Sequence, residues 1–442
     1  MKLTAPLFFL TAVLSAGFGS SRVMSQTEAA PFALAEPVKG KVFNGRDFGA
    51  KGDGVTKDTA ALQQALDSCV AAGGGEVLVP AGNYLTGSLV LGGRTTLRFE
   101  PGATLTGSPD VADYPFVQAR WEGEFRPSHR ALLSAEKANH VSIVGPGTLV
   151  GPPLALAQLR PRGPGTGRGP VIIEAAECKD LLIEGITVHY QRLWSVHPML
   201  CERVVIRGVT IRSSLSNGDG LDIDSCQDVL VEKCDIDGGD DAISLKSGRG
   251  LAAMNLRRPT ENVLIRDSIL RSSRFAAIGL GTEMSGGIRH VRIERCTLSG
   301  VENCIYIKSR DGRGGYMEDI SGDHLIVETS PTFIGIDLMT KGIQASDPVT
   351  GIPDKWARVQ NLKFTHIQVN GVANLVLGKS ISAERPIDGL VLSAITGTCR
   401  RGITLANVVN ADFSALHVSV FTGPLLTLTN VTGRGLENPP QK

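Results

Sequence analysis

The sequence predicts an all-β protein folded as a parallel β-helix, in which short strands stack on one another coil by coil. A short unit of alternating apolar residues recurs along the chain, and Cys178 and Cys201 open two successive copies that are 23 residues apart. This spacing is typical of solenoid repeats. The units are rich in β-branched residues, and almost no helical periodicity separates them. These features favour a β-helix over a leucine-rich repeat.

Each repeated unit begins with polar residues or a cysteine and continues with alternating apolar residues, as expected for a strand with one buried face. Clear copies occupy residues 139–143, 178–183, 201–206, 226–231 and 260–265, and further copies begin near Ile288, Glu318, Val359, Ile387 and Asn410. Cys178, Cys201 and Cys226 take equivalent places in three copies, so we expect a stack of small buried side chains. A disulfide among these three residues is an open alternative.

The N-terminal part of the predicted domain differs from the repeats because it contains a helix. Asp58 or Thr59 can begin this helix as a capping residue. Its apolar face would consist of Leu62, Ala65, Leu66, Cys69 and Val70. Strands are predicted at residues 42–44, 76–80 and 84–91. The helix is therefore expected to cover the open first coil.

The first 25 residues are predicted to be a secretory signal peptide with an undefined cleavage point. Lys2 gives the positive start, and residues 7–18 form an apolar run too short to span a bilayer. A buried strand is the alternative for this run. We expect an exported, periplasmic or extracellular protein with one domain at residues 42–435. The formal net charge of +1 gives no indication of a nucleic-acid partner.

The strongest functional signal is a group of acids within residues 217–248. Asp219 and Asp240 lie directly beside glycine, where bare backbone lets a large ligand approach, and Asp241 follows. Acids are depleted in strands, yet both acidic clusters lead into strand-like runs. Crowded carboxylates have pKa values that are pushed apart, so one can act as an acid while another acts as a base. Solvated turn residues are the alternative for each acid taken alone.

The repeat places these acids on neighbouring coils, which are about 4.8 Å apart in a parallel sheet. Carboxylates several ångströms apart, with a water between them, suit an inverting cleavage of a glycosidic bond. Asp222 and Asp224 either orient these acids or line the edge of the coil.

From about Phe43 onward, the chain resembles glycoside hydrolase family 28, the polygalacturonases, and particularly its bacterial and plant-like exo-acting members. The family's Asn-Thr-Asp corresponds to residues 217–219, and its Asp-Asp pair to Asp240 and Asp241. Residues 194–198 and 281–287 also resemble family segments. The resemblance implies a right-handed parallel β-helix that needs no metal or other cofactor. It implies that Asp240 is the general acid and that Asp219 and Asp241 hold and activate the attacking water.

Besides Gly218, which stands in place of the threonine of the family's Asn-Thr-Asp, two departures from the family pattern matter. Phe275 stands where the family has a histidine, and Tyr306 replaces the arginine of the family's Arg-Ile-Lys, so that Lys308 is left alone. Losing one cation removes a charge-assisted bond to a uronate, which is worth about 1.5–3 kcal/mol. Tyr306 can stack on a sugar face instead. The subsite can therefore take a neutral sugar such as rhamnose or xylose in place of galacturonate.

Other polar residues are weaker candidates for substrate binding. The predicted substrate-binding residues are Asn217, Lys246, Lys308, Tyr306, His197 and Arg310. The cations among them, with Arg249, either form a groove for uronates or are ordinary surface charges. His197 is either a substrate contact or a structural histidine. Three long loops, at residues 110–130, 160–170 and 249–259, are either the sides of a groove or solvated insertions.

We therefore expect a secreted, monomeric glycoside hydrolase that cleaves a galacturonan or rhamnogalacturonan-type pectic polysaccharide or oligosaccharide. No nucleic acid is expected as a partner, and no membrane after signal removal. Two alternatives remain. One is a calcium-dependent pectate-lyase-like enzyme on the same solenoid, which would give an unsaturated product. The other is a non-catalytic carbohydrate-binding β-helix, which would bind without turnover.

Overall fold

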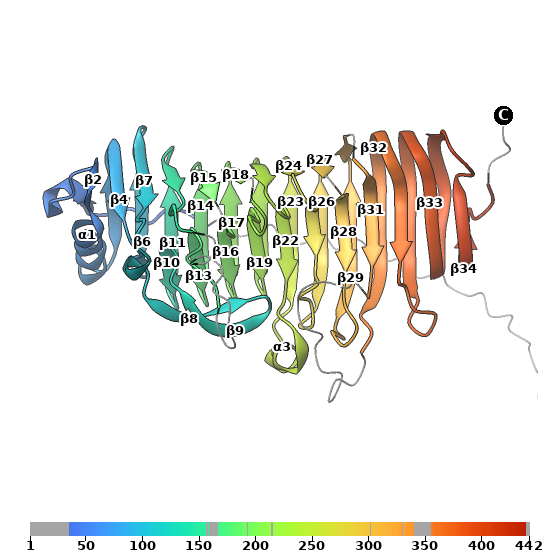
Figure 1. Cartoon of the computed structure of the whole chain (residues 1–442), viewed down its shortest axis with the longest axis horizontal. Coiled ribbons are helices and arrows are strands. Elements are labelled where there is room, and N and C mark those ends of the chain that lie inside the picture. Colours follow the sequence, from blue (N-terminus) through green and yellow to red (C-terminus); the bar gives the residue numbers. More distant parts are fainter. Residues whose placement is uncertain are drawn as a thin grey trace, which may run out of the picture. The chain divides into compact units, whose positions relative to one another are not determined.

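The predicted parallel β-helix is confirmed by the computed structural model (Figure 1). It describes residues 35–155, 158, 167–191, 193–213, 215–300, 302–328, 330–339 and 355–438. The predicted signal peptide at residues 1–25 lies outside them. Figure 1 shows the strands side by side, in chain order, from the N-terminal to the C-terminal end of the described part. Each coil contributes one strand to each of three parallel ladders, called ladders 1, 2 and 3.

Ladder 1 carries the candidate site. Its strands are β5 (Leu89–Leu91), β10 (Leu133–Glu136), β13 (Ile173–Ala176), β16 (Val196–Met199), β19 (Leu221–Asp224), β22 (Ile243–Lys246), β25 (Ala276–Leu280), β28 (Asn303–Lys308) and β31 (Thr332–Asp337). The interior of the coil takes the alternate apolar residues, such as Leu221 and Ile223 of β19, which are fully buried in the core.

Ladder 2 contains the repeated units seen in the sequence. Its strands are β1 (Val42–Asn44), β3 (Gly75–Val79), β6 (Thr95–Phe99), β11 (Asn139–Val144), β14 (Lys179–Glu184), β17 (Glu202–Arg207), β20 (Gln227–Glu232), β23 (Thr260–Arg266), β26 (Ile288–Glu294) and β29 (Tyr316–Asp323). Val204, Val229 and Val263 are in register on successive coils, so like side chains stack directly on one another.

Ladder 3 completes each coil. Its strands are β2 (Asp53–Lys57), β4 (Gly82–Thr86), β7 (Ala103–Gly107), β12 (Thr148–Val150), β15 (Thr187–Gln191), β18 (Thr210–Ser213), β21 (Asp235–Gly238), β24 (Ile269–Ser272), β27 (Thr297–Gly300) and β30 (Ile326–Val327). At the C-terminal end, long continuous strands replace the separate ones: β32 (Arg358–Lys379), β33 (Ile387–Val420) and β34 (Leu426–Arg434). Strand β32 pairs in turn with β29, β30 and β31, and so joins all three ladders.

Helix α1 (Thr59–Ala71) lies at the N-terminal end of the stack, where it was expected. Four of the five residues of its predicted apolar face are buried in the core, whereas Val70, near the end of the helix, is 42% exposed. Asp58 precedes the helix without capping it through its side chain. Its carboxylate instead accepts hydrogen bonds from the backbone N–H groups of Lys51 and Gly52.

Three local predictions were wrong. The strand expected at residues 84–91 is divided, because β4 belongs to ladder 3 and β5 to ladder 1. The expected loop at residues 110–130 contains an antiparallel hairpin, β8 (Phe116–Trp121) and β9 (Glu124–His129). A short helix, α3 (Gly250–Leu256), occupies much of the expected loop at residues 249–259. Most of the expected loop at residues 160–170 lies outside the described residues.

The cysteine stack contains no disulfide: all eight cysteines of the chain are buried free thiols. Cys201 donates its thiol hydrogen to the carbonyl of Ala175, and Cys226 donates to that of Pro198, each at 3.3 Å. The thiols therefore act as small buried groups that bond to the backbone of the preceding coil.

Candidate active site

The three predicted catalytic acids come together at the start of two adjacent strands in ladder 1. Asp219 lies just before β19, and Asp240 and Asp241 lie just before β22. The backbone N–H of Gly220 donates to the carbonyl of Asp241 at 3.0 Å, so Asp219 and Asp241 are on neighbouring coils. Asn217 adopts a left-handed conformation, with a φ of 60°, and its N–H donates to Oδ2 of Asp240 at 3.0 Å.

The three acids differ in their access to solvent. Asp219 is 4% exposed and Asp241 is 2% exposed, whereas Asp240 is only partly buried. Asp240 is therefore the carboxyl of the three that a ligand on the surface reaches first. Because buried carboxylates are costly unless they are paired, the other two require cations nearby.

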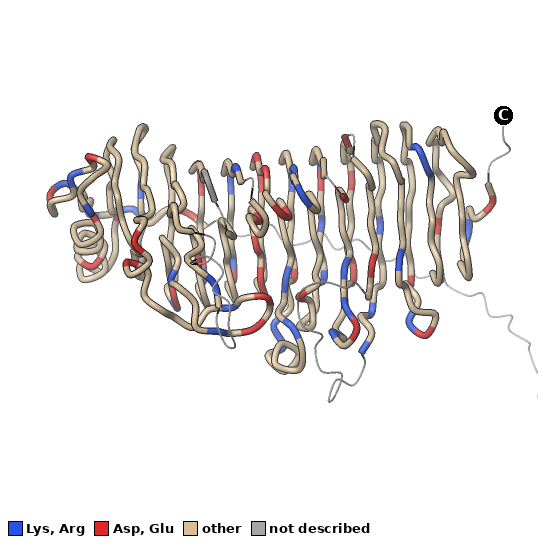
Figure 2. Tube along the Cα trace, viewed as in Figure 1, with Lys and Arg blue, Asp and Glu red and all other residues tan. Residues whose placement is uncertain are grey.

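Two lysines supply those cations: Lys246 is buried and Lys308 is partly buried. Lys246 Nζ lies 2.6 Å from Asp222 Oδ1 and 3.6 Å from Asp219 Oδ2. Lys308 Nζ lies 2.8 Å from Asp241 Oδ2. Figure 2 shows acidic and basic segments on neighbouring coils along the stack. The lysine ammonium groups lose hydration on burial, but the carboxylates around them outweigh this loss and raise the pKa of both.

Burial and mutual repulsion disfavour ionisation of the acids. Burial, followed by repulsion from Asp241, raises the pKa of Asp240 to about 6. Burial and the charge of Asp222 raise the pKa of Asp219 well above its ordinary value. The group as a whole thus retains a proton at a pH where an isolated aspartate is ionised. This is the property required of a general acid.

A second buried network supports β16 and β19 from the side. Arg120 of β8 donates from Nη1 to Asp224 Oδ1 at 2.5 Å and to Ser225 Oγ at 2.9 Å. Burial opposes ionisation of Asp224, but Arg120 and His197 lower its pKa to about 2. The hairpin is therefore tied to the coil that carries Asp219 by a fully buried ion pair.

The predicted substrate contact His197 belongs to this buried network. Its imidazole has no exposed surface; Nδ1 lies 3.0 Å from Glu174 Oε2, and Nε2 lies 3.6 Å from Asp224 Oδ2. Glu174 in turn pairs with Arg168, which is also fully buried. Burial lowers the pKa of His197. This placement favours a positioning role for His197 over a contact with substrate.

The family assignment follows from comparison with known proteins. The family model described as "Glycosyl hydrolases family 28" matches residues 69–374, more than half of the chain. The chain belongs to glycoside hydrolase family 28. It is therefore a glycoside hydrolase, as its sequence predicted. Among the described residues, no helix is both long enough and apolar enough to cross a lipid bilayer.

Individual family members agree with this assignment. The chain is 34% identical over 370 residues to a probable polygalacturonase of Vitis vinifera, covering 81% of this chain and 73% of the relative. It is 27% identical to an exo-poly-alpha-D-galacturonosidase of Dickeya chrysanthemi over 67% of this chain and 55% of the relative. The structure of an exopolygalacturonase from Thermotoga maritima superposes with a TM-score of 0.74 at 25% identity, over 86% of this chain and 93% of that one.

Aromatic rings lie beside both lysines of this family 28 protein, and Tyr306 and Phe275 are the rings closest to Lys308. Its Nζ lies 5.2 Å from the ring centroid of Tyr306 and 5.9 Å from that of Phe275, so both unusual residues flank one ammonium. Lys246 lies over the ring of Trp194 at 3.7 Å. Arg310 follows β28 and is partly buried. The two residues that depart from the family pattern, Tyr306 and Phe275, thus place aromatic rings beside the ammonium group of Lys308.

Two of the three predicted long loops meet beside this site. The N–H of Arg249, next to α3, donates to the carbonyl of Gly123 at the hairpin tip, and its Nη2 lies 2.8 Å from Glu124 Oε1. Figure 1 shows the hairpin β8–β9 and α3 on the same side of the stack. These loops are structured against one another, which favours a built groove edge over two unrelated solvated insertions.

Sequence reasoning missed Arg120, Arg168 and Glu174. The partner of Arg120, Asp224, is 104 residues away in the sequence, so no local spacing indicates the pair. Glu174 did leave a signal, because it is an acid within the otherwise apolar stretch of Val171, Ile172 and Ile173. An acid at such a position requires a buried partner.

Replacing Arg120 by Met is expected to lower the free energy of unfolding by about 3–5 kcal/mol, because it leaves Asp224 buried without its cation. Urea unfolding followed by circular dichroism measures this. The matched control is Arg295→Met, which breaks an ion pair with Asp267 at 2.7 Å between half-exposed side chains. The control should cost less than about 1 kcal/mol. Equal losses in the two variants would contradict the stabilising role of the buried pair.

Proposed function

We propose that the protein hydrolyses pectic polysaccharides of the galacturonan or rhamnogalacturonan type, with inversion at the anomeric carbon. The observation that carries this proposal is the meeting of three carboxyls on adjacent coils, one partly exposed with a raised pKa and two buried beside lysines. The similarity to proteins named as polygalacturonases supports the choice of substrate.

In this proposal, protonated Asp240 donates its proton to the glycosidic oxygen as the bond between that oxygen and the anomeric carbon breaks. Asp219 and Asp241 orient a water on the opposite face of the sugar, and one of these two carboxylates takes its proton as it attacks the same carbon. The water oxygen is retained in the new hydroxyl group, and the leaving sugar departs neutral. Lys308 Nζ lies 2.8 Å from Asp241 Oδ2 and so places a positive charge beside this carboxyl group.

We propose that the sugar bound next to Lys308 is neutral, or that the next sugar along the polysaccharide is neutral. A cavity of about 300 Å³ adjoins Tyr306. Its charged lining residues are Glu302, Asp337 and Lys379. Asp337 is in register with Lys308 on one side and with Lys379 on the other, so the two acids of the lining outnumber its one cation and disfavour a second uronate. Asn303 and Tyr306 add hydrogen-bonding groups and an aromatic face, which suit a neutral sugar.

We further propose that residues 42–435 act as one catalytic domain and that the chain is exported and monomeric. Except for the hairpin β8–β9, the strands from Val42 to Arg434 belong to one hydrogen-bonded array, which supports a single domain. A polymeric substrate also favours an enzyme that acts outside the cytoplasm.

Asp240→Asn should abolish hydrolysis on a panel of pectic polysaccharides, because an amide cannot donate the proton; a loss of at least about 100-fold in kcat is expected. Reducing-end release measures activity, and circular dichroism checks the fold. Asp237→Asn, which changes a carboxyl that is 41% exposed on β21, is the control and should retain full activity. Turnover retained in Asp240→Asn would exclude this residue as the acid. An unsaturated product from the unmodified protein would indicate a lyase instead.

The pH dependence of kcat/KM should report the proton on Asp240. Asp240 acts in its protonated form, so activity should be high below its pKa and fall as the pH rises through about 6. The charge of Lys308 lowers this pKa. Lys308→Met should therefore move the alkaline limb to higher pH while reducing the maximum rate. If the alkaline limb of the pH profile stays in place or moves to lower pH in Lys308→Met, the proposed effect of Lys308 on the pKa of Asp240 is contradicted.

Tyr306→Arg should raise cleavage of homogalacturonan relative to pectin that contains rhamnose or xylose, because it adds a second cation for a uronate. The gain in the ratio of kcat/KM values is expected to be about 10-fold, from one charge-assisted hydrogen bond. Tyr306→Phe is the matched control, since it keeps the aromatic face and adds no charge. An unchanged ratio in Tyr306→Arg would refute the proposed subsite.

A further inference from the structure

A cluster of two histidines and one aspartate lies on ladder 2, apart from the acids of ladder 1. Asp323 ends β29, and His324 follows it directly; His366 lies within β32. Asp323 is in register with Thr365, so His324 and His366 hold the same turn position on adjacent coils. Both have a left-handed backbone, with φ values of 53° and 54°, and therefore project their side chains in the same direction.

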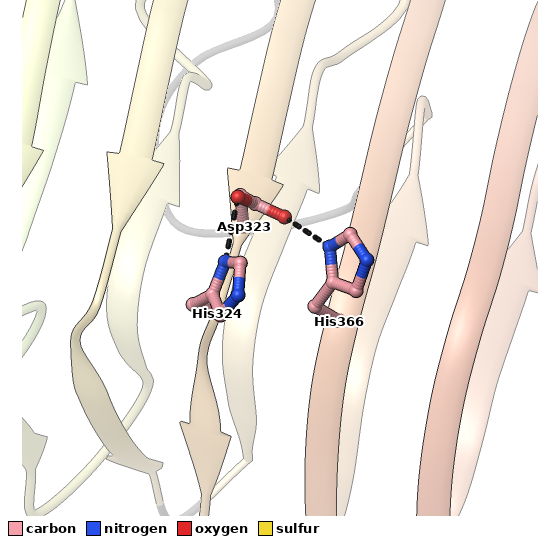
Figure 3. Close-up of side chains that lie close together, drawn as sticks. All are labelled: Asp323, His324 and His366. Atoms are coloured by element: carbon pink, nitrogen blue, oxygen red, sulfur yellow. Dashed lines mark hydrogen bonds and ion pairs between the residues drawn. The ribbon is translucent and has the colours of Figure 1, made fainter.

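The two imidazoles converge on one carboxylate (Figure 3). Nδ1 of His324 lies 2.7 Å from Asp323 Oδ2, and Nδ1 of His366 lies 2.8 Å from Asp323 Oδ1. The rings are stacked with their centroids 4.7 Å apart. Thr365 donates its hydroxyl hydrogen to Asp323 Oδ1 at 2.7 Å, which fixes the carboxylate from behind. All three ligand atoms lie within 4.8 Å of one another.

We propose that Asp323, His324 and His366 form a surface site for a divalent transition-metal ion such as Zn²⁺. In a tetrahedral zinc site the ligands are about 2.0–2.2 Å from the metal, which places them about 3.3–3.5 Å from each other. The present nitrogen–oxygen separations are slightly shorter, so small side-chain rotations admit an ion between the three groups. The stacked coils supply the rigid backbone that holds the ligands in place.

The chemistry of the ligands selects the class of metal. Imidazole nitrogen suits Zn²⁺, Cu²⁺ and Ni²⁺, whereas Ca²⁺ and Mg²⁺ favour sites made of oxygen alone. Three protein ligands leave a fourth position for water. The side chains of Asp323, His324 and His366 are 42%, 62% and 57% exposed, so solvent reaches that position. The hydroxyl of Thr365 acts as the outer partner that orients a ligating carboxylate.

This arrangement differs from the other histidine–carboxylate contacts on the surface of the coils. His290 lies 3.3 Å from Asp319, and His140 lies 3.4 Å from Asp180, but each is a single imidazole beside one acid. Within the part of the chain that the structure describes, only the Asp323 cluster brings three such groups within bonding range of one ion. His290, which is 54% exposed, therefore offers a matched control on the same ladder.

A bound ion would also connect two coils. Its ligands come from β29 and β32, where β32 begins to join the three ladders. Coordination would link side chains of the two coils, in addition to the hydrogen bonds that already join their backbones. Metal binding should therefore stabilise the C-terminal part of the stack without involving the acids of ladder 1.

The test is a calorimetric titration of the full, chelator-treated chain with ZnCl₂, repeated on His324→Ala, His366→Ala and His290→Ala. One saturable site per chain is expected for the unmodified protein and for His290→Ala. Affinity should fall by more than about 10-fold in His324→Ala and in His366→Ala, because losing even an outer partner of a ligand costs about 10- to 100-fold. Circular dichroism checks that each exposed substitution leaves the fold intact.

Two further readouts separate a defined site from loose binding. Co²⁺ should give the visible absorption of a low-coordinate nitrogen and oxygen site with the unmodified protein and lose it in His366→Ala. Zn²⁺ should raise the melting temperature of the unmodified protein and of His290→Ala, but not that of His366→Ala. Absence of a saturable site, or equal zinc affinity in the unmodified protein, His324→Ala and His366→Ala, would overturn the proposal.

Discussion

The structure depends on the parallel hydrogen-bond register between successive coils. In ladder 1, Leu221 faces Ile243 and Asp224 faces Lys246, and this pairing fixes which side chains of β19 and β22 can meet. Side chains alternate between the two faces of a strand, so a slip of one residue would exchange the core and the outer face. The buried apolar stack of each coil prevents such a slip. The same stack thereby determines the position of Asp219 relative to Asp240 and Asp241.

The register has an electrostatic consequence at the site. Stacked coils bring like charges together as readily as like apolar residues, and Asp219, Asp222 and Asp241 all become buried. Lys246 and Lys308 come from later coils of the same ladder and compensate part of this charge. The compensation is incomplete at Asp240, which is partly exposed and keeps a raised pKa. Fold stability and acid chemistry are therefore linked through the same pairs.

The stack of strands and the acidic cluster could be predicted from the sequence, for a physical reason. Repeats leave a periodic trace, and acids beside glycine in strand-like runs are rare enough to stand out, as at Asp219 and Asp240. Contacts between the coils and the long insertions leave no such trace in the sequence. Arg120 finds Asp224 only because the hairpin folds back onto the coil, and the division between β4 and β5 depends on a change of ladder inside one apolar run. Neither the buried ion pair nor the change of ladder can be read from the spacing of neighbouring residues in the sequence.

The outer turns show how one backbone position acquires different chemistry. Asp267, Arg295, His324 and His366 follow one another on successive coils, and all have φ values between 52° and 54°. Where Arg295 stands beside Asp267, the neighbours form an ordinary ion pair. Two imidazoles beside the carboxylate of Asp323 instead direct one nitrogen atom each at its two oxygens. Because the coil spacing is constant, the residue type alone decides whether such a position stabilises the stack or offers ligands to an ion.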